Sequence, residues 1–352
     1  MPKKYPLLIA ERVSNGMKVA VVIPNWNGAD MIVECLRSLA DQMYEHTVVV
    51  VDNGSVDNSV ALIEQNFPDA VLLKNPVNLG FAGGVNTGIR HALGHDFDAV
   101  ALLNNDAIAD KDWLGSLVRN LESYPEVGIA TCKLMSMDKS HIDSTGDIYT
   151  TWGIPYPRGR NEEASTQYDD LPWVFGASGG ASLYRLAMLR EIGLFDEDFF
   201  AYYEDVDISF RAQLAGWKVR YEPKAEVYHA TSTTGSRVKG FFTYQTIKNY
   251  PFIFWKNVPI KLFPTILPRF LLAYSIFTLK GLLTPRRTWP TIKGLFVTTA
   301  LLPRKLVQRH SIQKNRKVSV EYVRSILTWD LPPNAHKLRS LRSFWQRLLG
   351  KH

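Results

Sequence analysis

VALLNNDA, residues 100–107, is a run of four apolar residues that passes directly into two amides and a carboxylate. Val100 to Leu103 have the composition of a fully buried strand. Asn104, Asn105 and Asp106 follow with no turn residue in between, and ligands of α/β proteins bind beyond the ends of such strands. The stretch therefore predicts a strand whose end carries functional groups.

Stretches of the same Val-, Ile- and Leu-rich character surround it at residues 18–24, 47–52, 70–75 and 127–134. Helical spacing of apolar residues separates them at 30–42, 56–66, 82–94 and 111–123. Continuous apolar strands that alternate with helices predict an α/β fold with a parallel sheet covered on both faces. Further along the chain we expect a Pro- and Gly-rich loop at 153–171, strands at 173–177, 217–221 and 226–230, and helices at 184–191 and 204–215.

Polar residues also follow the neighbouring strands. Asn25 and Asn27 come after the first strand, Asp52 and Asn53 after the second, and Asn78 after the third. Because parallel strands end at one edge of a sheet, these residues are expected to lie together with Asn104 to Asp106. The carboxylate of Asp52 could accept a hydrogen bond from a nucleotide base or a ribose hydroxyl, or it could be structural.

A glycine-rich stretch, NLGFAGGVNTGI (78–89), begins the helix after the third strand. Its glycines would let backbone N–H groups approach a diphosphate, although close packing of the helix on the sheet explains them equally well. The stretch lacks the G-x-G-x-x-G spacing of dinucleotide sites.

FFAYYEDVDISFR (199–211) places two acids in the first turn of an expected helix. Glu204 and Asp205 follow an aromatic run that could wall a pocket and raise the pKa of a carboxyl group towards that of a useful base. The alternative is that the helix dipole alone favours acids there. Asp207 and Arg211 are spaced as a surface ion pair, and Val206 is expected to face the core.

His229 ends the last expected strand, before a Ser/Thr-rich loop. It is either a structural histidine or a contact for a metal or a phosphate. The two cysteines, Cys35 and Cys132, match neither metal nor disulfide spacing and fit a reduced compartment.

The net charge of +7 is unevenly distributed. Residues 280–352 contain 16 Lys and Arg but two acids, a charge of +14, which leaves −7 for residues 1–279. Residues 258–283 are apolar and aromatic, yet their longest uncharged run, 270–279, is ten residues, about half the length of a spanning helix. We therefore expect helices that lie in an anionic membrane interface, and not a nucleic-acid site, since no recognition motif accompanies the charge. A buried helical subdomain with a solvated basic face is the alternative.

Together, VVIPNWNG, VVVVDNGSVDNS, NLGFAGGVNTGI, ALLNNDA and the long stretch from GASGGAS to AGWKV resemble the family 2 inverting glycosyltransferases. The likeness is close to the rhamnosyltransferase branch of bacterial cell-surface polysaccharide synthesis and covers about residues 17–235. It implies the GT-A fold, a Rossmann-like, mainly parallel sheet flanked by helices. It also implies an N-terminal extension (1–16), a GT-A domain (17–238) with a nucleotide-sugar half (17–135) and an acceptor half (136–238), and a basic membrane-associating region (239–352).

The resemblance also assigns roles to residues. Those implied to bind the nucleotide-sugar are Pro24, Asn25, Asn27, Asp52, Asn53, Asn78, Gly80, Phe81, Gly84, Asn104 and Asn105. Asp106 stands where the family has its Asp-x-Asp metal motif and His229 matches a histidine that can join the metal, so Mg²⁺ or Mn²⁺ is implied. Asp205 matches the presumed general base, and Glu204 precedes it.

These roles imply metal-assisted single displacement from a nucleotide-diphosphate sugar, and the resemblance makes dTDP-rhamnose the first choice. The basic C-terminal region fits a lipid-linked or glycan acceptor at the cytoplasmic face of the cell membrane. Asn104 stands in place of the first aspartate of the motif, which predicts weak metal binding in the absence of donor. Two alternatives are a nucleotidyltransferase, although VIPNWNG lacks the basic residues of its activating loop, and a membrane-associated scaffold that has lost catalysis.

Overall fold

The computed structural model describes residues 16–230 and 238–331. Residues 1–15 of the expected N-terminal extension, the Ser/Thr-rich loop after His229 and the basic run at 336–352 lie outside the described residues.

Four parallel strands form the first half of the sheet, as the sequence predicts. They are β1 (Val19–Asn25), β2 (Thr47–Asn53), β3 (Val71–Asn75) and β4 (Ala99–Leu103), in the order β4-β1-β2-β3. Register pairs Asn25 with Asp52 at the carboxyl ends of β1 and β2. The polar residues that follow these strands are therefore delivered to one edge of the sheet.

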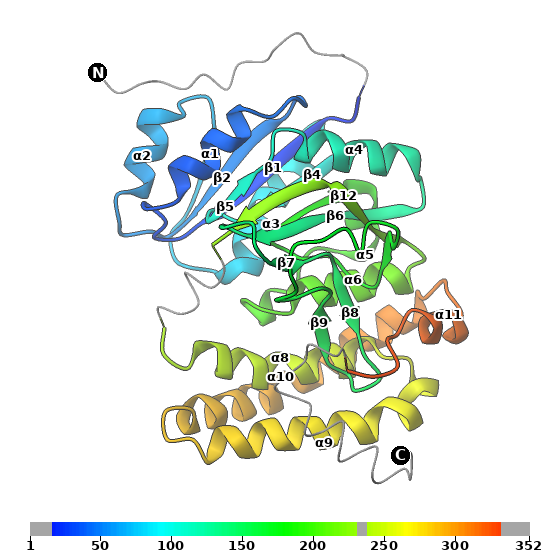
Figure 1. Cartoon of the computed structure of the whole chain (residues 1–352). Helices are drawn as coiled ribbons and strands as arrows, with labels where there is room; N and C mark the ends of the chain where they lie inside the picture. The colour runs from blue at the N-terminus through cyan, green and yellow to red at the C-terminus, as the bar shows by residue number, and fades with distance from the viewer. Residues whose placement is uncertain (1–15, 231–237, 332–352) are drawn as a thin grey trace.

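Helices cover both faces of this sheet (Figure 1). One face packs against α1 (Ile32–Ala40), α2 (Ser59–Asn66) and α4 (Trp113–Ser123). The other packs against α3 (Gly80–Leu93), α5 (Leu186–Ile192) and α6 (Glu204–Leu214). Burial on both faces explains why the strands are continuous apolar runs rather than alternating ones.

The second half of the sheet is mixed. β11 (Ala181–Arg185) is antiparallel to both β4 and β6 (Val127–Ser136), while β12 (Lys218–His229) is parallel to β6. Short strands complete this part: β5 (Ala107–Ala109) and β10 (Trp173–Val174) pair with β12, and β7 (Ile142–Ser144) pairs with β6. A separate two-stranded sheet joins β8 (Asp147–Tyr149) to β9 (Pro155–Pro157), and β9 lies within the expected loop.

Elements expected in this region are present with different bounds. The helix expected at 184–191 begins at Leu186, because residues 181–185 fill the slot between β4 and β6 as a strand. The two strands expected at 217–221 and 226–230 are one strand, β12, whose register shifts between Glu222 and Glu226. Pro223 lies in that shift, and its missing N–H explains why the ladder is interrupted there.

The C-terminal helices form a further layer beyond α6 (Figure 1). They are α8 (Phe241–Asn257), α9 (Phe263–Leu282), α10 (Thr288–Lys314) and α11 (Val320–Ser325), with a short 3₁₀ turn at Ile260–Leu262 between α8 and α9. Another 3₁₀ turn, Glu197–Phe199, precedes α6. Their aromatic core is shared with the first part of the chain, since Tyr149 and Phe210 pack in the same cluster as Tyr250 and Phe254. The expected division of the chain near residue 238 remains a prediction, and this core crosses it.

One segment of the described chain, residues 260–282, is long and apolar enough to cross a membrane by length and composition, and most of its apolar stretch is not buried in the protein. It is longer than the ten-residue uncharged run suggested, because the helix continues through Arg269 and Lys280. Whether it lies in an interface, as the sequence predicts, stays a prediction.

A buried ion cluster joins α8 and α10 to the end of α6. We define it as Asp196, Asp198, Asp207, Arg211, Lys256 and Lys305. Nζ of Lys256 lies 2.6 Å from Asp196 and 2.9 Å from Asp207, and Nζ of Lys305 lies 2.7 Å from both Asp196 and Asp198. Three carboxylates thus meet three cations.

The expectation of a surface ion pair between Asp207 and Arg211 is half wrong. The pair exists at 2.9 Å, but Asp207 is fully buried, because α8 covers this face of α6 and supplies Lys256 and Asn257 to it. Two lysines of the basic C-terminal region, Lys256 and Lys305, are therefore internal counterions and do not contribute to its surface charge.

Candidate active site

The ends of β1 and β4 are tied together by amides. Asn25, fully buried, accepts a hydrogen bond from Nδ2 of Asn105 at 2.9 Å and donates to the hydroxyl of Ser59 at 2.9 Å. Asn27 has φ +50° and accepts from the backbone N–H of Val56 at 2.9 Å. These bonds hold the loops after β1 and β2 side by side, so the sequence reading that groups them is supported by direct contacts.

Asp52 is the buried carboxylate of this group. Its Oδ2 accepts a long hydrogen bond, 3.4 Å, from the backbone N–H of Ser55. Its Oδ1 is buried and has no hydrogen-bond partner among the described residues. A buried carboxylate oxygen without a donor is costly, so a ligand that supplies an N–H or O–H would be bound favourably here.

The start of α3 is built around Asn53 and Asn78. Nδ2 of Asn53 donates to Oδ1 of Asn78 at 3.1 Å and to the carbonyl of Gly80 at 2.8 Å, and Oδ1 of Asn78 accepts from the N–H of Gly80 at 2.8 Å. Both side chains therefore serve the local backbone. Asn53 and Asn78, which the sequence groups with the site, therefore shape the start of α3 through these hydrogen bonds.

The glycines of this stretch are required by close contacts. Gly80 has φ +74°, and a Cβ placed there would lie 2.3 Å from the carbonyl oxygen of Phe200. At Gly84 a Cβ would lie 3.1 Å from Nδ2 of Asn53 and 3.6 Å from Cβ of Pro24. Close packing thus explains these two glycines. The contact at Gly80 also brings α3 against Phe200, in the segment that precedes Glu204 and Asp205.

Asp106 and His229 meet at the ends of β4 and β12. Oδ1 of Asp106 lies 3.1 Å from Nε2 of His229, whose Nδ1 lies 3.0 Å from Oδ2 of Asp143. Oδ1 of Asp143 is in turn 2.9 Å from Arg160. Burial disfavours the charged imidazole, but the two carboxylates outweigh it and raise the pKa of His229 to about 9. Nδ2 of Asn104 also lies 3.2 Å from Nε2.

The acidic pair at the start of α6 follows a strained backbone. Phe200, Tyr202 and Tyr203 have φ of +63°, +67° and +74°, each a conformation that costs an aromatic residue about 1–3 kcal/mol. Oδ2 of Asp205 accepts from the N–H of Gly179 at 3.0 Å and Oδ1 from that of Val206 at 2.8 Å. Strain of this kind is typical of functional loops.

Burial raises the pKa of both acids. For Glu204 the neighbouring Asp205 adds to burial and raises the pKa well above its ordinary value, and Oε2 of Glu204 has no partner within the described chain. The backbone donors of Gly179 and Val206 oppose the upward shift of the pKa of Asp205. Asp147, also buried, has its pKa raised by burial and by Asp205.

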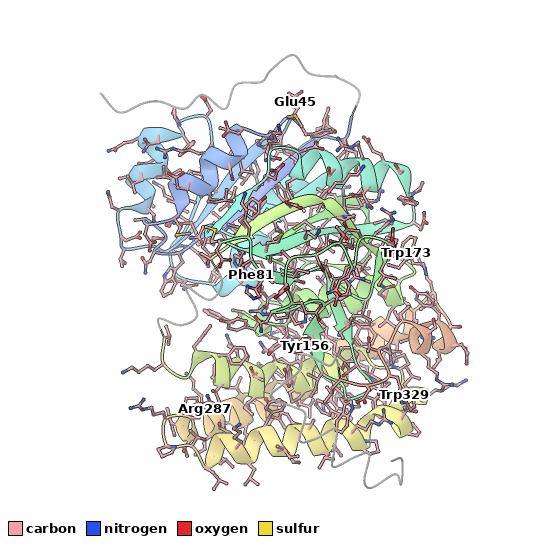
Figure 2. All side chains as sticks on the ribbon, in the orientation of Figure 1. Glu45, Phe81, Tyr156, Trp173, Arg287 and Trp329 are labelled. Atoms are coloured by element: carbon pink, nitrogen blue, oxygen red, sulfur yellow. The ribbon has the colours of Figure 1, made fainter. Side chains whose placement is uncertain are left out.

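A glycine pair connects the two halves of the site. The N–H of Gly179 donates to Asp205, while the carbonyl of Gly180 accepts from the N–H of Asn104 at 2.9 Å. A Cβ on Gly179 would lie 3.2 Å from the ring of Phe81. Phe81 lies between the sheet and the C-terminal helices (Figure 2). Adjacent residues of one segment thus touch the Asn104 to Asp106 stretch and the acidic pair.

Residues 20–193 match the family model described as Glycosyl transferase family 2. The chain carries a family 2 glycosyltransferase domain. This confirms the resemblance inferred from the sequence and makes the protein a glycosyltransferase.

Curated relatives are glycosyltransferases as well. The chain is 28% identical over 212 residues to N-acetylglucosaminyl-diphospho-decaprenol L-rhamnosyltransferase of Mycobacterium tuberculosis, covering 54% of this chain and 68% of the relative. It is 27% identical over 214 residues to poly-beta-1,6-N-acetyl-D-glucosamine synthase of Staphylococcus aureus, covering 59% of this chain and 48% of the synthase. The chain therefore spans about half the length of the synthase.

A solved mannosyltransferase from Pyrobaculum calidifontis, in complex with GDP-Man and Mn²⁺, has the same fold. Its TM-score is 0.53 at 16% identity, with 86% of each chain covered. The match confirms the expected fold class, a GT-A-like sheet flanked by helices.

Sequence reasoning about this glycosyltransferase missed three residues that the structure brings into the candidate site. Asp143, Asp147 and Gly179 lie in segments that carry no strand-end pattern, and the first two belong to short strands that were not expected. The two acids four residues apart in HIDSTGD (141–147) are the one signal that could have pointed to Asp143 and Asp147.

Proposed function

We propose that the protein transfers a sugar, with inversion, from a nucleotide-diphosphate donor to a hydroxyl of a lipid-linked saccharide, with dTDP-rhamnose as the first-choice donor. The observation that carries the proposal is the Gly179–Gly180 segment, which contacts both the Asn104 to Asp106 stretch and the buried acid Asp205. A donor bound at the first and an acceptor hydroxyl at the second would meet across this segment.

The donor would occupy the ends of β1, β2 and β4. Oδ1 of Asp52, which has no hydrogen-bond partner in residues 16–230 and 238–331, supports a contact with a base N–H or a ribose hydroxyl. Pro24, Asn25, Asn27 and Asn105 would shape the nucleoside pocket, and the helix start at Gly80 would face the diphosphate. Because Asn53 and Asn78 are engaged with the backbone, we assign them to positioning that helix start.

Asp106 and His229 fit a divalent cation by the chemistry of their donors. Within residues 16–230 and 238–331, no three His, Cys, Asp or Glu side chains are grouped to hold a metal. The protein would thus supply a carboxylate oxygen and one imidazole nitrogen, with Asp143 orienting the ring through Nδ1, and the donor diphosphate would supply further ligands. Bound Mg²⁺ or Mn²⁺ would neutralise charge on the leaving diphosphate.

Asp205 would act as the general base. The acceptor hydroxyl gives its proton to the carboxylate while its oxygen bonds to the anomeric carbon, and the bond from that carbon to the nucleoside diphosphate breaks. One displacement inverts the anomeric centre. Glu204 is buried beside Asp205, and its Oε2, which has no hydrogen-bond partner in the part of the chain that the structure describes, would face the acceptor.

The proposal of a lipid-linked acceptor and a membrane surface draws support from the M. tuberculosis relative's name and from the outer face of α9 and α10. Trp289 and Phe296 are 71% and 74% exposed there, among the exposed bases Arg286, Arg287 and Lys293. Figure 2 labels Arg287 at one end of this helical layer and Trp329 at the other. Exposed aromatic and basic residues on one surface suit the anionic, cytoplasmic face of a cell membrane.

The decisive test is Asp205→Asn. We expect it to abolish transfer from dTDP-rhamnose while dTDP binding, followed by calorimetry, stays within about twofold of the parent. Normal turnover by this variant would refute the assignment of the base. A thermal-shift screen of nucleotide-sugars with Mn²⁺ identifies the donor, and stabilisation by none of them would favour a scaffold without catalysis.

Metal binding and membrane binding have separate tests. Mn²⁺ should bind measurably in the presence of dTDP and weakly without it, and Asp106→Ala should remove the nucleotide-dependent part. A Trp289→Ser, Phe296→Ser double variant of the full chain should partition less onto anionic vesicles, whereas the buried core would be untouched. Equal partitioning of this variant and the parent would contradict the proposed surface.

A further inference from the structure

Helix α8 presents one fully buried amide to the loop that precedes the acidic pair. Nδ2 of Asn249 donates to the carbonyls of Phe199 at 3.1 Å, Ala201 at 3.0 Å and Tyr202 at 2.8 Å. Three carbonyl oxygens of residues 199–202 therefore converge on a single side-chain nitrogen. Nζ of Lys248, the preceding residue, donates to the carbonyls of Asp198 and Phe199 at 2.8 and 3.1 Å.

This convergence depends on the strained backbone of the loop. The positive φ values at Phe200 and Tyr202 turn the carbonyls of Phe199, Ala201 and Tyr202 towards the same side, where ordinary backbone geometry would not bring them. The carbonyl of Phe199 also accepts from the N–H of Ala201 and from Lys248. Without Asn249, however, the carbonyls of Ala201 and Tyr202 would have no hydrogen-bond donor among the described residues, and the loop would relax towards unstrained conformations. Asn249 thus pairs the groups that the strained conformation would otherwise leave bare.

The loop ends at the groups proposed to do chemistry. Tyr203, with φ +74°, is the N-cap residue of α6, so Glu204 and Asp205 begin directly after it. On the donor side, the carbonyl of Phe200 accepts from the N–H of Ala82 at 3.1 Å and lies against Gly80. The loop held by Asn249 consequently touches both the helix start of α3 and the acidic pair.

We propose that Asn249 is a positioning residue that sets the geometry of Asp205 relative to the donor. This inference rests on the proposed function, since it takes Asp205 as the base. Asn249 lies in α8, outside residues 20–193 that match the family model. The C-terminal helical layer therefore contributes to catalysis as well as to packing.

Asn257 provides a matched control on the same helix. It is also fully buried, its Nδ2 also makes an intramolecular hydrogen bond, 2.8 Å to Oδ1 of Asp207, and Oδ1 of both asparagines lacks a partner among the described residues. Asn257 supports the body of α6 and does not touch the 199–202 carbonyls. Loss of either amide should cost similar stability, so a difference in turnover reports on positioning.

The test compares Asn249→Ala and Asn257→Ala in the full chain, using dTDP-rhamnose, Mn²⁺ and a polyprenyl-diphosphate-linked N-acetylglucosamine. Displacement of a reacting group by about 1 Å can cost about 100-fold in rate, so we expect kcat of Asn249→Ala to fall by at least about 10-fold, with the donor KM within about twofold. Asn257→Ala should keep kcat within about twofold at a similar Tm. Asn249→Ser, which retains one O–H donor, should recover part of kcat and gives a milder variant if Asn249→Ala does not fold.

Two outcomes separate the inference from its foundation. If Asp205→Asn is inactive but both Asn249 variants turn over like Asn257→Ala, the positioning role of Asn249 is refuted and the base assignment stands. If Asp205→Asn turns over normally, the proposed base fails and the inference fails with it.

Discussion

Replacing Lys305 by Met tests whether the buried ion cluster holds the C-terminal helices on the catalytic part of the chain. Lys305 is fully buried, and its Nζ lies 2.7 Å from both Asp196 and Asp198. Removing one partner of a buried ion pair costs about 3–5 kcal/mol, because the remaining charges lose their compensation without regaining water.

The structure places the expected cost at the lower end of this range. Asp196 keeps Lys256 at 2.6 Å, and Asp198 keeps Arg304 at 3.1 Å, so neither carboxylate is left alone. We therefore expect Lys305→Met to lower the free energy of unfolding by about 3 kcal/mol. At about 2 °C per kcal/mol for a chain of this size, Tm should fall by about 6 °C.

Arg304→Met is the matched control, since it removes the adjacent cation from the same helix. The Arg304 side chain is 64% exposed, so its pair with Asp198 should contribute less than about 1 kcal/mol. Urea and thermal unfolding of the two variants, followed by circular dichroism, give the comparison. Equal stabilities for Lys305→Met and Arg304→Met would refute the idea that burial of the ion cluster makes it stabilising.

Three further predictions concern acid stability, backbone space and the pH profile. Burial alone would raise the pKa of Asp196, but the lysines of the ion cluster outweigh it and lower that pKa. The contribution of Asp196 to stability is therefore present above about pH 4 and is lost progressively as pH falls below that value. Urea titrations at pH 7, 5 and 3.5 should follow this loss of stability, and the loss should be smaller in Lys305→Met. Gly80→Ala should destabilise the protein by more than about 2 kcal/mol and weaken dTDP binding, because its Cβ would meet the carbonyl oxygen of Phe200 at 2.3 Å. Gly94→Ala is the control and should be close to neutral, since the nearest atom to its Cβ would be 3.5 Å away. Similar Tm values for the two variants would contradict this prediction. Burial raises the pKa of Asp205, and a general base acts only when it is deprotonated. The pH profile of kcat should therefore have an acid limb whose apparent pKa lies above the ordinary aspartate pKa of about 4. An acid limb with an apparent pKa at or below about 4 would argue against Asp205 as the base.

Much of the parallel half of the sheet could be predicted from sequence, because burial on both faces leaves uninterrupted apolar strands with polar residues at their ends. The alignment of Asn25 with Asp52, and the contact of Asn25 with Asn105, follow from that arrangement. The antiparallel strand at residues 181–185 could not be predicted, since its position between β4 and β6 is a tertiary fact that local periodicity does not encode.

The candidate site divides in the same way. Asp52, Asp106 and Asp205 stand at element ends, where sequence patterns reveal them. Asp143 could not be found from spacing, because its role depends on a contact with His229 across 86 residues. Asp207 was placed on the surface because its own helix offers Arg211 at i+4, whereas the burial comes from α8, about 50 residues later.

The ion cluster and the shared aromatic core also limit how the C-terminal region could be exchanged between related enzymes. A graft made at residue 238 would bring foreign helices against Asp196 and Asp207, and those carboxylates would face apolar or like-charged neighbours unless the incoming helices carried lysines at the positions of Lys256 and Lys305. The C-terminal helices and residues 196–211 therefore form one unit in this chain, and a stable chimera requires residues 196–211 to travel with the helices that cover them.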